Sequence, residues 1–180
     1  MRITRRSVAL EANMPSRIVD ELEAQWIDLA LPPGPKLREH LGAGRTLVLL
    51  AGAPGSGKTL SACLALVDRG IGAFVSAPWY AEMHASFRTQ LLAERAAERT
   101  MLVIDDLGEE SERDAPALAQ LLTHRYDLAG RCTTIVTSNL RPKEIGPRYG
   151  KRIISRLEDP RHSAVIACRA VLRPRRGADG

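Results

Sequence analysis

Short continuous runs of apolar residues alternate with stretches of helical periodicity along most of the chain. Such runs are typical of parallel strands that helices bury on both faces. We expect five of them to be strands, at residues 46–51, 71–77, 101–104, 132–137 and 163–168. Helical patterns lie between them, at residues 59–70, 79–99, 112–129 and, in one or two short pieces, 142–158. This order predicts an α/β fold, a three-layer sandwich with a five-stranded parallel sheet.

The chain before the first strand has a helical pattern of its own over residues 16–30. Ser16 is placed to be its N-cap, and one face would carry Ile18, Leu22, Trp26 and Leu29. After a Pro- and Gly-rich break, a second short helix is expected at about residues 35–42. The apolar face suits docking on a partner or packing back onto the rest of the chain, and both alternatives stay open.

Composition agrees with this architecture. The chain has 180 residues, of which 44% are hydrophobic and only 4% aromatic, so one domain with an aliphatic core is expected. The net charge is +5, and arginines gather near both ends, at Arg2, Arg5 and Arg6 and at Arg169, Arg173, Arg175 and Arg176. Such clusters suit an anionic partner such as nucleic acid, or are simply solvated tails.

Two function classes are disfavoured by what the sequence lacks. Cys63, Cys132 and Cys168 are far apart and have neither the spacing of a zinc site nor an even number for a disulfide framework. The N-terminus has acidic residues where a signal peptide needs an apolar run, and no apolar segment reaches bilayer length. We therefore expect a cytoplasmic protein with no membrane contact.

The first predicted strand runs directly into the glycine-rich sequence GAPGSGKT at residues 52–59. Glycines let a loop wrap its backbone N–H groups around a phosphate, and the following helix adds its positive end. In such a loop Lys58 would bridge the β- and γ-phosphates of ATP, and Thr59 would ligate Mg²⁺. The alternative is a glycine turn before an ordinary helix. The residues expected at the nucleotide are Gly52, Ala53, Pro54, Gly55, Ser56, Gly57, Lys58, Thr59 and Leu60.

A second chemical signal is MLVIDDLG, where the third predicted strand ends in two aspartates. Nucleotides bind at the carboxyl ends of strands in open α/β sheets, so we expect Asp105 to hold Mg²⁺ through water. Asp106 would orient or deprotonate the attacking water. A glutamate would reach further, which predicts slow hydrolysis, and Glu109 and Glu110 are expected to be solvated loop charges instead.

The fourth predicted strand ends in TTIVTSN, which would aim a polar side chain at the γ-phosphate. Asn139 is our first choice for this side chain and Thr137 the second. A capping role for Asn139 at the turn after the strand is the alternative.

Taken in order, GAPGSGKT, MLVIDDLG, IVTSNLRPKEI and RIISRL resemble the motifs of AAA+ ATPases. The resemblance covers about residues 40–170 and is to the helicase-loader branch, which includes DnaC-type loaders and IstB-type transposition helpers. It implies that Arg156 is an arginine finger completing a neighbouring subunit's site, with Arg152 in support. The alternative is two surface arginines paired with Glu158 or Asp159.

The resemblance also implies how the chain is divided and how it acts. We expect a helical extension at 1–40, an ATPase core at 41–172 and a basic tail at 173–180, without the helical lid of many AAA+ proteins. The implied function is an ATPase that forms a homo-oligomer with ATP and acts on a hexameric replicative helicase and single-stranded DNA. A transposition helper acting on a transposase is the alternative, and a small P-loop kinase or a weakly hydrolysing scaffold is more remote.

An aromatic cluster between the second and third predicted strands, made by Trp79, Tyr80 and Phe87 with Arg88, could stack on single-stranded DNA. Packing in the core is the favoured interpretation. The four histidines show no metal-ligand spacing and receive no chemical role.

Overall fold

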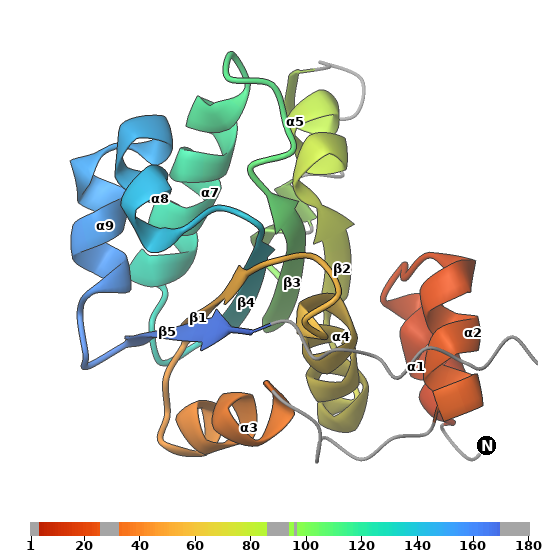
Figure 1. Ribbon diagram of the computed structural model, residues 1–180. Helices are drawn as coiled ribbons and strands as arrows, with labels where there is room; N and C mark the ends of the chain where they lie inside the picture. The colour runs from red at the N-terminus through yellow and green to blue at the C-terminus, as the bar shows by residue number, and fades with distance from the viewer. Residues whose placement is uncertain (1–3, 26–32, 86–93, 96, 170–180) are drawn as a thin grey trace, which may run out of the picture.

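The computed structural model of the protein describes residues 4–25, 33–85, 94–95 and 97–169 (Figure 1). A single five-stranded sheet forms its centre, in the order β2-β3-β4-β1-β5 with every neighbouring pair parallel. This confirms the predicted fold class. The strands are β1 (Leu47–Gly52), β2 (Ala73–Ser76), β3 (Met101–Leu107), β4 (Thr133–Ser138) and β5 (Ser163–Cys168).

Helices cover both faces of the sheet, because alternate strand residues point to opposite sides and both sets are apolar. In β1, Val48 and Leu50 belong to one buried cluster, while Leu47 and Leu49 belong to the other. The first cluster packs against α1 (Arg5–Glu11), α2 (Ser16–Gln25), α3 (Gly34–Gly42) and α4 (Lys58–Arg69). The second packs against α5 (Ala77–Ala85), α7 (Ala115–Asp127), α8 (Pro142–Tyr149) and α9 (Lys151–Leu157).

Several element boundaries differ from the expectation. The short helix α1 was not predicted, and it forms because Thr4 and Ser7 make a reciprocal capping box at its start. The helix α2 begins at Ser16 itself, since the Val19 N–H donates to the Pro15 carbonyl, so the N-cap prediction for Ser16 is wrong. The strand β3 continues through both aspartates. The break between α8 and α9 at Gly150 agrees with the two short helices expected in this stretch.

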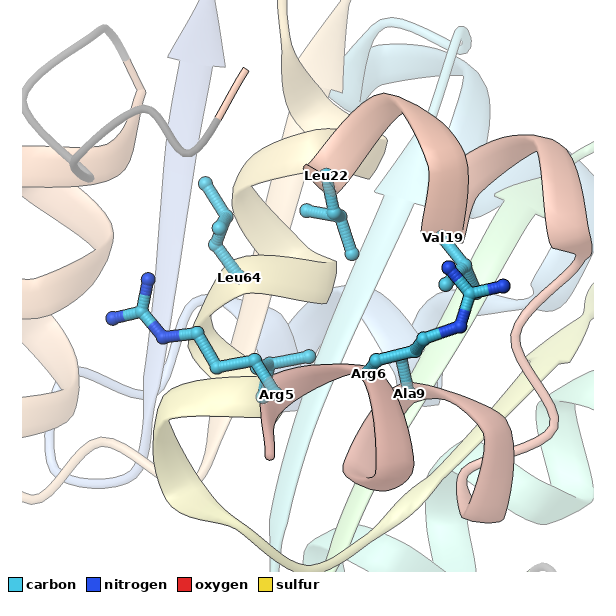
Figure 2. A pocket seen from close by; sticks show the side chains of 7 residues that line it. Arg5, Arg6, Ala9, Val19, Leu22 and Leu64 are labelled. Atoms are coloured by element: carbon cyan, nitrogen blue, oxygen red, sulfur yellow. The ribbon is translucent and has the colours of Figure 1, made fainter. Parts of the chain in front are cut away.

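The N-terminal helices α1 and α2 pack on α4. Ile18 and Leu22 are buried there, and the Phe74 N–H at the edge strand β2 donates to the Ala12 carbonyl after α1, with an N···O distance of 2.7 Å. Figure 2 shows a small apolar pocket between these helices, with side chains from all three, Ala9, Val19, Leu22 and Leu64, around it and Arg5 and Arg6 at its sides. For α2 the structure therefore shows packing back onto the core. Trp26 and Leu29 lie outside the described residues.

A buried arginine lies at the end of the sheet where the strands begin, opposite their carboxyl ends. Arg125 on α7 is only 2% exposed. Its guanidinium donates to the Thr134 hydroxyl at 2.8 Å and to the backbone carbonyls of Ala97, Arg99 and Thr133. All four acceptors are uncharged, and they come from the segment before β3 and from β4 itself. Arg125 thus ties α7 to the starts of two central strands.

Candidate nucleotide site

The glycine-rich loop lies between the end of β1 and the start of α4, at the carboxyl edge of the sheet. Gly55 and Gly57 have φ angles of +76° and +79°, in the left-handed region that favours glycine. Gly52 is constrained in another way, since a Cβ there would lie 2.0 Å from the Cys168 carbonyl oxygen on β5. The glycines therefore let the loop turn sharply and let β1 approach β5.

Lys58 is held inside this loop. It is 6% exposed, and its Nζ donates to the Gly52 and Ala53 carbonyls at 2.8 Å each and to the Ser56 hydroxyl at 3.3 Å. Burial lowers the pKa of Lys58, while Cys168, Asp106 and Asp105 oppose that shift. The ammonium group lies at the N-terminus of the twelve-residue helix α4, where the first backbone N–H groups have no intrahelical acceptor. Both features attract a phosphate.

Asp105 connects the loop to the next two strands. Its Oδ1 accepts from the Thr59 hydroxyl at 2.8 Å and from the Thr137 hydroxyl at 2.6 Å. Thr137 in turn accepts from the Asp106 N–H at 3.0 Å. The structure thus brings Thr59 of α4, Asp105 of β3 and Thr137 of β4 into direct contact, although they are far apart in sequence.

The chemistry of Thr59 and Asp105 fits Mg²⁺. Magnesium prefers oxygen ligands and is usually held by one or two carboxylates together with substrate phosphates and water. A hydroxyl and a carboxylate in contact beside a phosphate-binding loop supply such a donor set. Within the described residues no group of three or more His, Cys, Asp or Glu side chains could hold a metal by itself.

Asp106 has an unusual backbone conformation. Its φ angle is +57°, and the pairing of β3 with β4 shifts register between Ile104 and Leu107, around this residue. Aspartate tolerates the left-handed region better than most residues, and such conformations cluster at functional sites. Burial raises the pKa of Asp106, as do the neighbouring charges of Asp105 and Glu109. The carboxylate is therefore a stronger base than an ordinary aspartate.

Replacing Asp106 by asparagine is expected to change stability and turnover in opposite directions. A raised pKa means that the folded chain binds the proton of the Asp106 carboxyl group more tightly than the unfolded chain does. The stability that this bound proton contributes is lost as pH rises through the folded-state pKa. At pH 8, Asp106→Asn should therefore melt at a higher temperature than wild type, and the difference should shrink toward pH 4. If Asp106 acts on the attacking water, turnover should fall by about 10²-fold.

Thermal melts at both pH values and single-turnover ATP hydrolysis would check this prediction. Glu112→Gln is the matched control, because Glu112 is an exposed carboxylate outside the site. A lower melting temperature for Asp106→Asn at pH 8 would contradict the electrostatic argument.

The two candidates at the end of β4 are placed differently. Thr137 is fully buried and bonded to Asp105, whereas Asn139 is exposed and its Nδ2 lies 3.4 Å from Glu109 Oε1. The residue in contact with the aspartate pair is thus Thr137, our second choice. Strand alternation explains this, since residues 137 and 139 share a face only while the strand continues, and β4 ends at Ser138.

Glu110 is wrongly predicted as a solvated loop charge. It is 4% exposed, and its carboxylate accepts hydrogen bonds from the Gly108 N–H, the Arg148 guanidinium and the Tyr149 hydroxyl. The sequence offers no periodic signal for this burial, because the partners lie 38 and 39 residues further along the chain. Glu109, in contrast, is exposed as expected.

Arg156 lies on α9, away from the glycine-rich loop. Its NH2 group pairs with Asp127 Oδ1 at 2.7 Å, and its guanidinium carbon lies 5.1 Å from the centre of the Tyr126 ring. Its NH1 group is buried and has no hydrogen-bond partner. Asp159 pairs with Arg161 instead, so neither predicted carboxylate is the partner of Arg156. Arg156 and the exposed Arg152 both line an open cleft beside Tyr126.

A second cleft borders the glycine-rich loop and was missed by sequence reasoning. Its walls are α3 and β5, and Ser56 of the loop is at its edge. Its lining includes Pro33, Lys36 and His40 from α3 and the residue before it, and Ile166 and Cys168 from β5. No motif marks them, because a cleft of this kind is created only when α3 packs beside β5.

The aromatic cluster is divided. Tyr80 is buried in the core, with its ring 6.0 Å from that of His84, and Trp79 packs partly buried against the same core cluster. This agrees with the core interpretation for these two residues. Phe87 and Arg88 lie outside the described residues.

Two remaining features are the covalent state of the cysteines and the length of the helices. Cys63, Cys132 and Cys168 are all buried and free. Over the described ranges, no helix has the length and apolar character needed to cross a membrane.

No family model and no curated protein sequence matches the chain. Solved structures do match it. The DnaC helicase loader aligns with a TM-score of 0.60 at 20% identity, covering 76% of this chain and 88% of that one. DnaI aligns with a TM-score of 0.63 at 20% identity, covering 87% and 92%.

A third match is replication initiator DnaA bound to AMPPCP and single-stranded DNA, with a TM-score of 0.58 at 19% identity. The alignment covers 75% of this chain but only 44% of DnaA, so the chain spans less than half of that protein. At these identities the likeness concerns the fold. The resemblance expected from the motifs is therefore confirmed at that level: the protein has the P-loop α/β fold shared by the DnaC helicase loader, by DnaI and by DnaA.

Proposed function

We propose that this protein is an ATPase that assembles with ATP and loads a hexameric replicative helicase onto single-stranded DNA. The observation that carries the proposal is the contact between Thr59 and Asp105 beside the Lys58 loop, on a fold shared with the DnaC helicase loader and with DnaI. This arrangement offers a phosphate site, an Mg²⁺ donor set and a nearby carboxylate.

Each group has a distinct task in hydrolysis. The loop and Lys58 bind the phosphates, and Thr59 with Asp105 would hold Mg²⁺, which neutralises charge on the transferring phosphoryl group when bound. Asp106 orients the attacking water, and its raised pKa helps it to accept a proton. The cleft between α3 and β5 adjoins the loop and has room for the base and sugar of the nucleotide.

The position of Arg156 supports an assembly. The helix α7 leaves the carboxyl edge of the sheet after β3 and ends before the start of β4, so Asp127 lies toward the opposite edge. Arg156 pairs with Asp127 there, while the glycine-rich loop is at the carboxyl edge. Arg156 therefore cannot complete the site of its own chain, and a second copy would supply the arginine.

The partner is proposed from the fold likeness. The DnaC structure is that of a helicase loader, and the DnaA structure contains single-stranded DNA and the ATP analogue AMPPCP. The same fold in this chain is compatible with these partners, and the transposition helper remains the alternative.

The proposal can be tested with purified protein and the hexameric helicase of its host. ATP turnover should rise when helicase and single-stranded DNA are added, and light scattering should detect a larger assembly with ATP than without it. Lys58→Ala should lower turnover by about 10²-fold or more, because it removes the cation at the phosphates. Lys143→Ala, at an exposed position on α8, is the matched control.

Wild-type protein that neither binds ATP nor assembles in its presence would contradict the proposal. Stimulation by a transposase and duplex DNA, with no response to helicase, would favour the transposition helper instead.

A further inference from the structure

Glu110 is a buried carboxylate with a full set of polar contacts close to the nucleotide site. Its side chain is 1% exposed, and its Oε1 accepts from Arg148 Nε at 2.9 Å and from the Tyr149 hydroxyl. Its Oε2 accepts from the Gly108 N–H at 2.9 Å, and Arg148 also donates to the Glu110 backbone carbonyl. Because a buried charge is costly unless it is paired and hydrogen-bonded, this arrangement is strongly held.

One end of this cluster is the segment that follows Asp106. Gly108 has a φ angle of +110°, and a Cβ there would lie 2.8 Å from the Leu140 side chain, so the segment is pressed against the chain after β4. The Ser138 hydroxyl also donates to the Leu107 carbonyl at 2.5 Å. Residues 106–110 are therefore held against the chain after β4 by several contacts, and they form the shortest covalent path from Asp106 to Glu110.

The other end is the helix that leads to the arginines. Arg148 and Tyr149 stand at the end of α8, and Gly150 alone separates α8 from α9. The helices α8 and α9 pack on each other, and α9 carries Arg152 and Arg156. A displacement of the end of α8 is thus passed directly to the arginine-bearing helix.

Tyr149 can donate its hydrogen bond to Glu110 only while its hydroxyl is protonated. Burial raises the pKa of Tyr149, and its hydrogen bond to Glu110 raises it further. The hydroxyl therefore stays protonated at all physiological pH values and remains a donor to the carboxylate.

We propose that Glu110 is a positioning residue that couples the Asp105–Asp106 end of β3 to helix α9. The nucleotide state of one subunit is then transmitted to the arginine that the same subunit presents to its neighbour. This inference rests on the proposed function, because it needs Arg156 to act in a neighbouring site.

Mixed assemblies can separate this role from a purely structural one. An acceptor subunit carrying Arg156→Ala keeps its own nucleotide site but supplies no arginine. A donor subunit carrying Asp106→Asn binds ATP and supplies the arginine, but it lacks the carboxylate that acts on the attacking water. Each variant alone should have little ATP turnover, and mixing them should restore it at junctions where the donor's Arg156 meets the acceptor's site.

The test places Glu110→Gln in the donor subunit alone. Glutamine keeps the shape of the side chain but loses the charge that Arg148 pairs with. Turnover of the mixture at saturating ATP should fall about 10-fold, while the KM for ATP stays unchanged, because the acceptor's binding site is intact. Tyr149→Phe in the donor removes one hydrogen bond to Glu110 and should cause a smaller fall in the same direction.

Glu112→Gln in the donor is the matched control and should leave turnover unchanged, since Glu112 is exposed. Thermal melts and light scattering of the donor variants check that they fold and assemble. An active mixture that is insensitive to both Glu110→Gln and Tyr149→Phe in the donor overturns the coupling. If neither wild type nor the mixture hydrolyses ATP, the shared-site ATPase itself is wrong.

Discussion

Replacing Arg156 by alanine is expected to lower ATP turnover on the order of 10³-fold, the lower end of the range for an arginine that stabilises phosphoryl transfer. The NH1 group of the guanidinium is buried and has no hydrogen-bond partner, so it gains an acceptor only when the side chain turns outward toward a neighbouring phosphate. The other contacts of the guanidinium, with Asp127 and the Tyr126 ring, hold the side chain against the end of α7. Turnover at saturating ATP and assembly by light scattering are the measurements.

Arg156→Lys separates charge from shape. Lysine keeps the positive charge but lacks the planar, forked guanidinium that binds phosphate through two N–H groups. It should therefore recover only part of the lost activity. Arg131→Ala is the control, because Arg131 is an exposed arginine elsewhere on the surface. An assembling Arg156→Ala variant with wild-type turnover would show that no arginine acts across the subunit boundary.

Replacing Arg125 by methionine should lower the free energy of unfolding by at least about 3 kcal/mol. Methionine fills much of the same volume but donates no hydrogen bond, so the carbonyls of Ala97, Arg99 and Thr133 lose a buried partner. Each unsatisfied buried acceptor costs roughly 1–3 kcal/mol. For a chain of this size the melting temperature should fall by roughly 10 °C.

Urea denaturation would measure this loss as a lower midpoint with an unchanged slope. Arg113→Met is the control for the loss of an arginine at an exposed position. The Arg113 side chain is 89% exposed, and its Nε lies 3.6 Å from Asp114 Oδ1. A midpoint for Arg125→Met close to that of wild type would mean that water replaces the guanidinium at these carbonyls.

The sequence alone determined the layers of the fold. Apolar runs such as that of β1 can be satisfied only by burial on both faces, so they predict a parallel sheet wherever they occur. The glycines at 52, 55 and 57 and the lysine after them also form a local pattern, because a turn and the helix it starts depend on neighbouring residues. These features need no information from distant parts of the chain.

Tertiary structure decided which polar side chains meet. Thr137 contacts Asp105 because β4 lies beside β3 in the sheet. The strand β4 ends at Ser138, so residue 139 no longer follows the alternation that places residue 137 beside Asp105. Strand order and the exact end of a strand depend on packing across the whole domain, and sequence spacing carries little of that information.

The same reason applies to the buried charges. Glutamate and arginine are usually found at the surface, yet Glu110 and Arg125 are both buried. Their hydrogen-bond partners lie 38 and 9 residues away along the chain. Burial of a charge depends on a complete set of hydrogen-bond partners, which exists only once the chain has folded. The sequence thus determined the layers and the phosphate loop, while folding determined the contacts of Asp105, Glu110 and Arg156 around them.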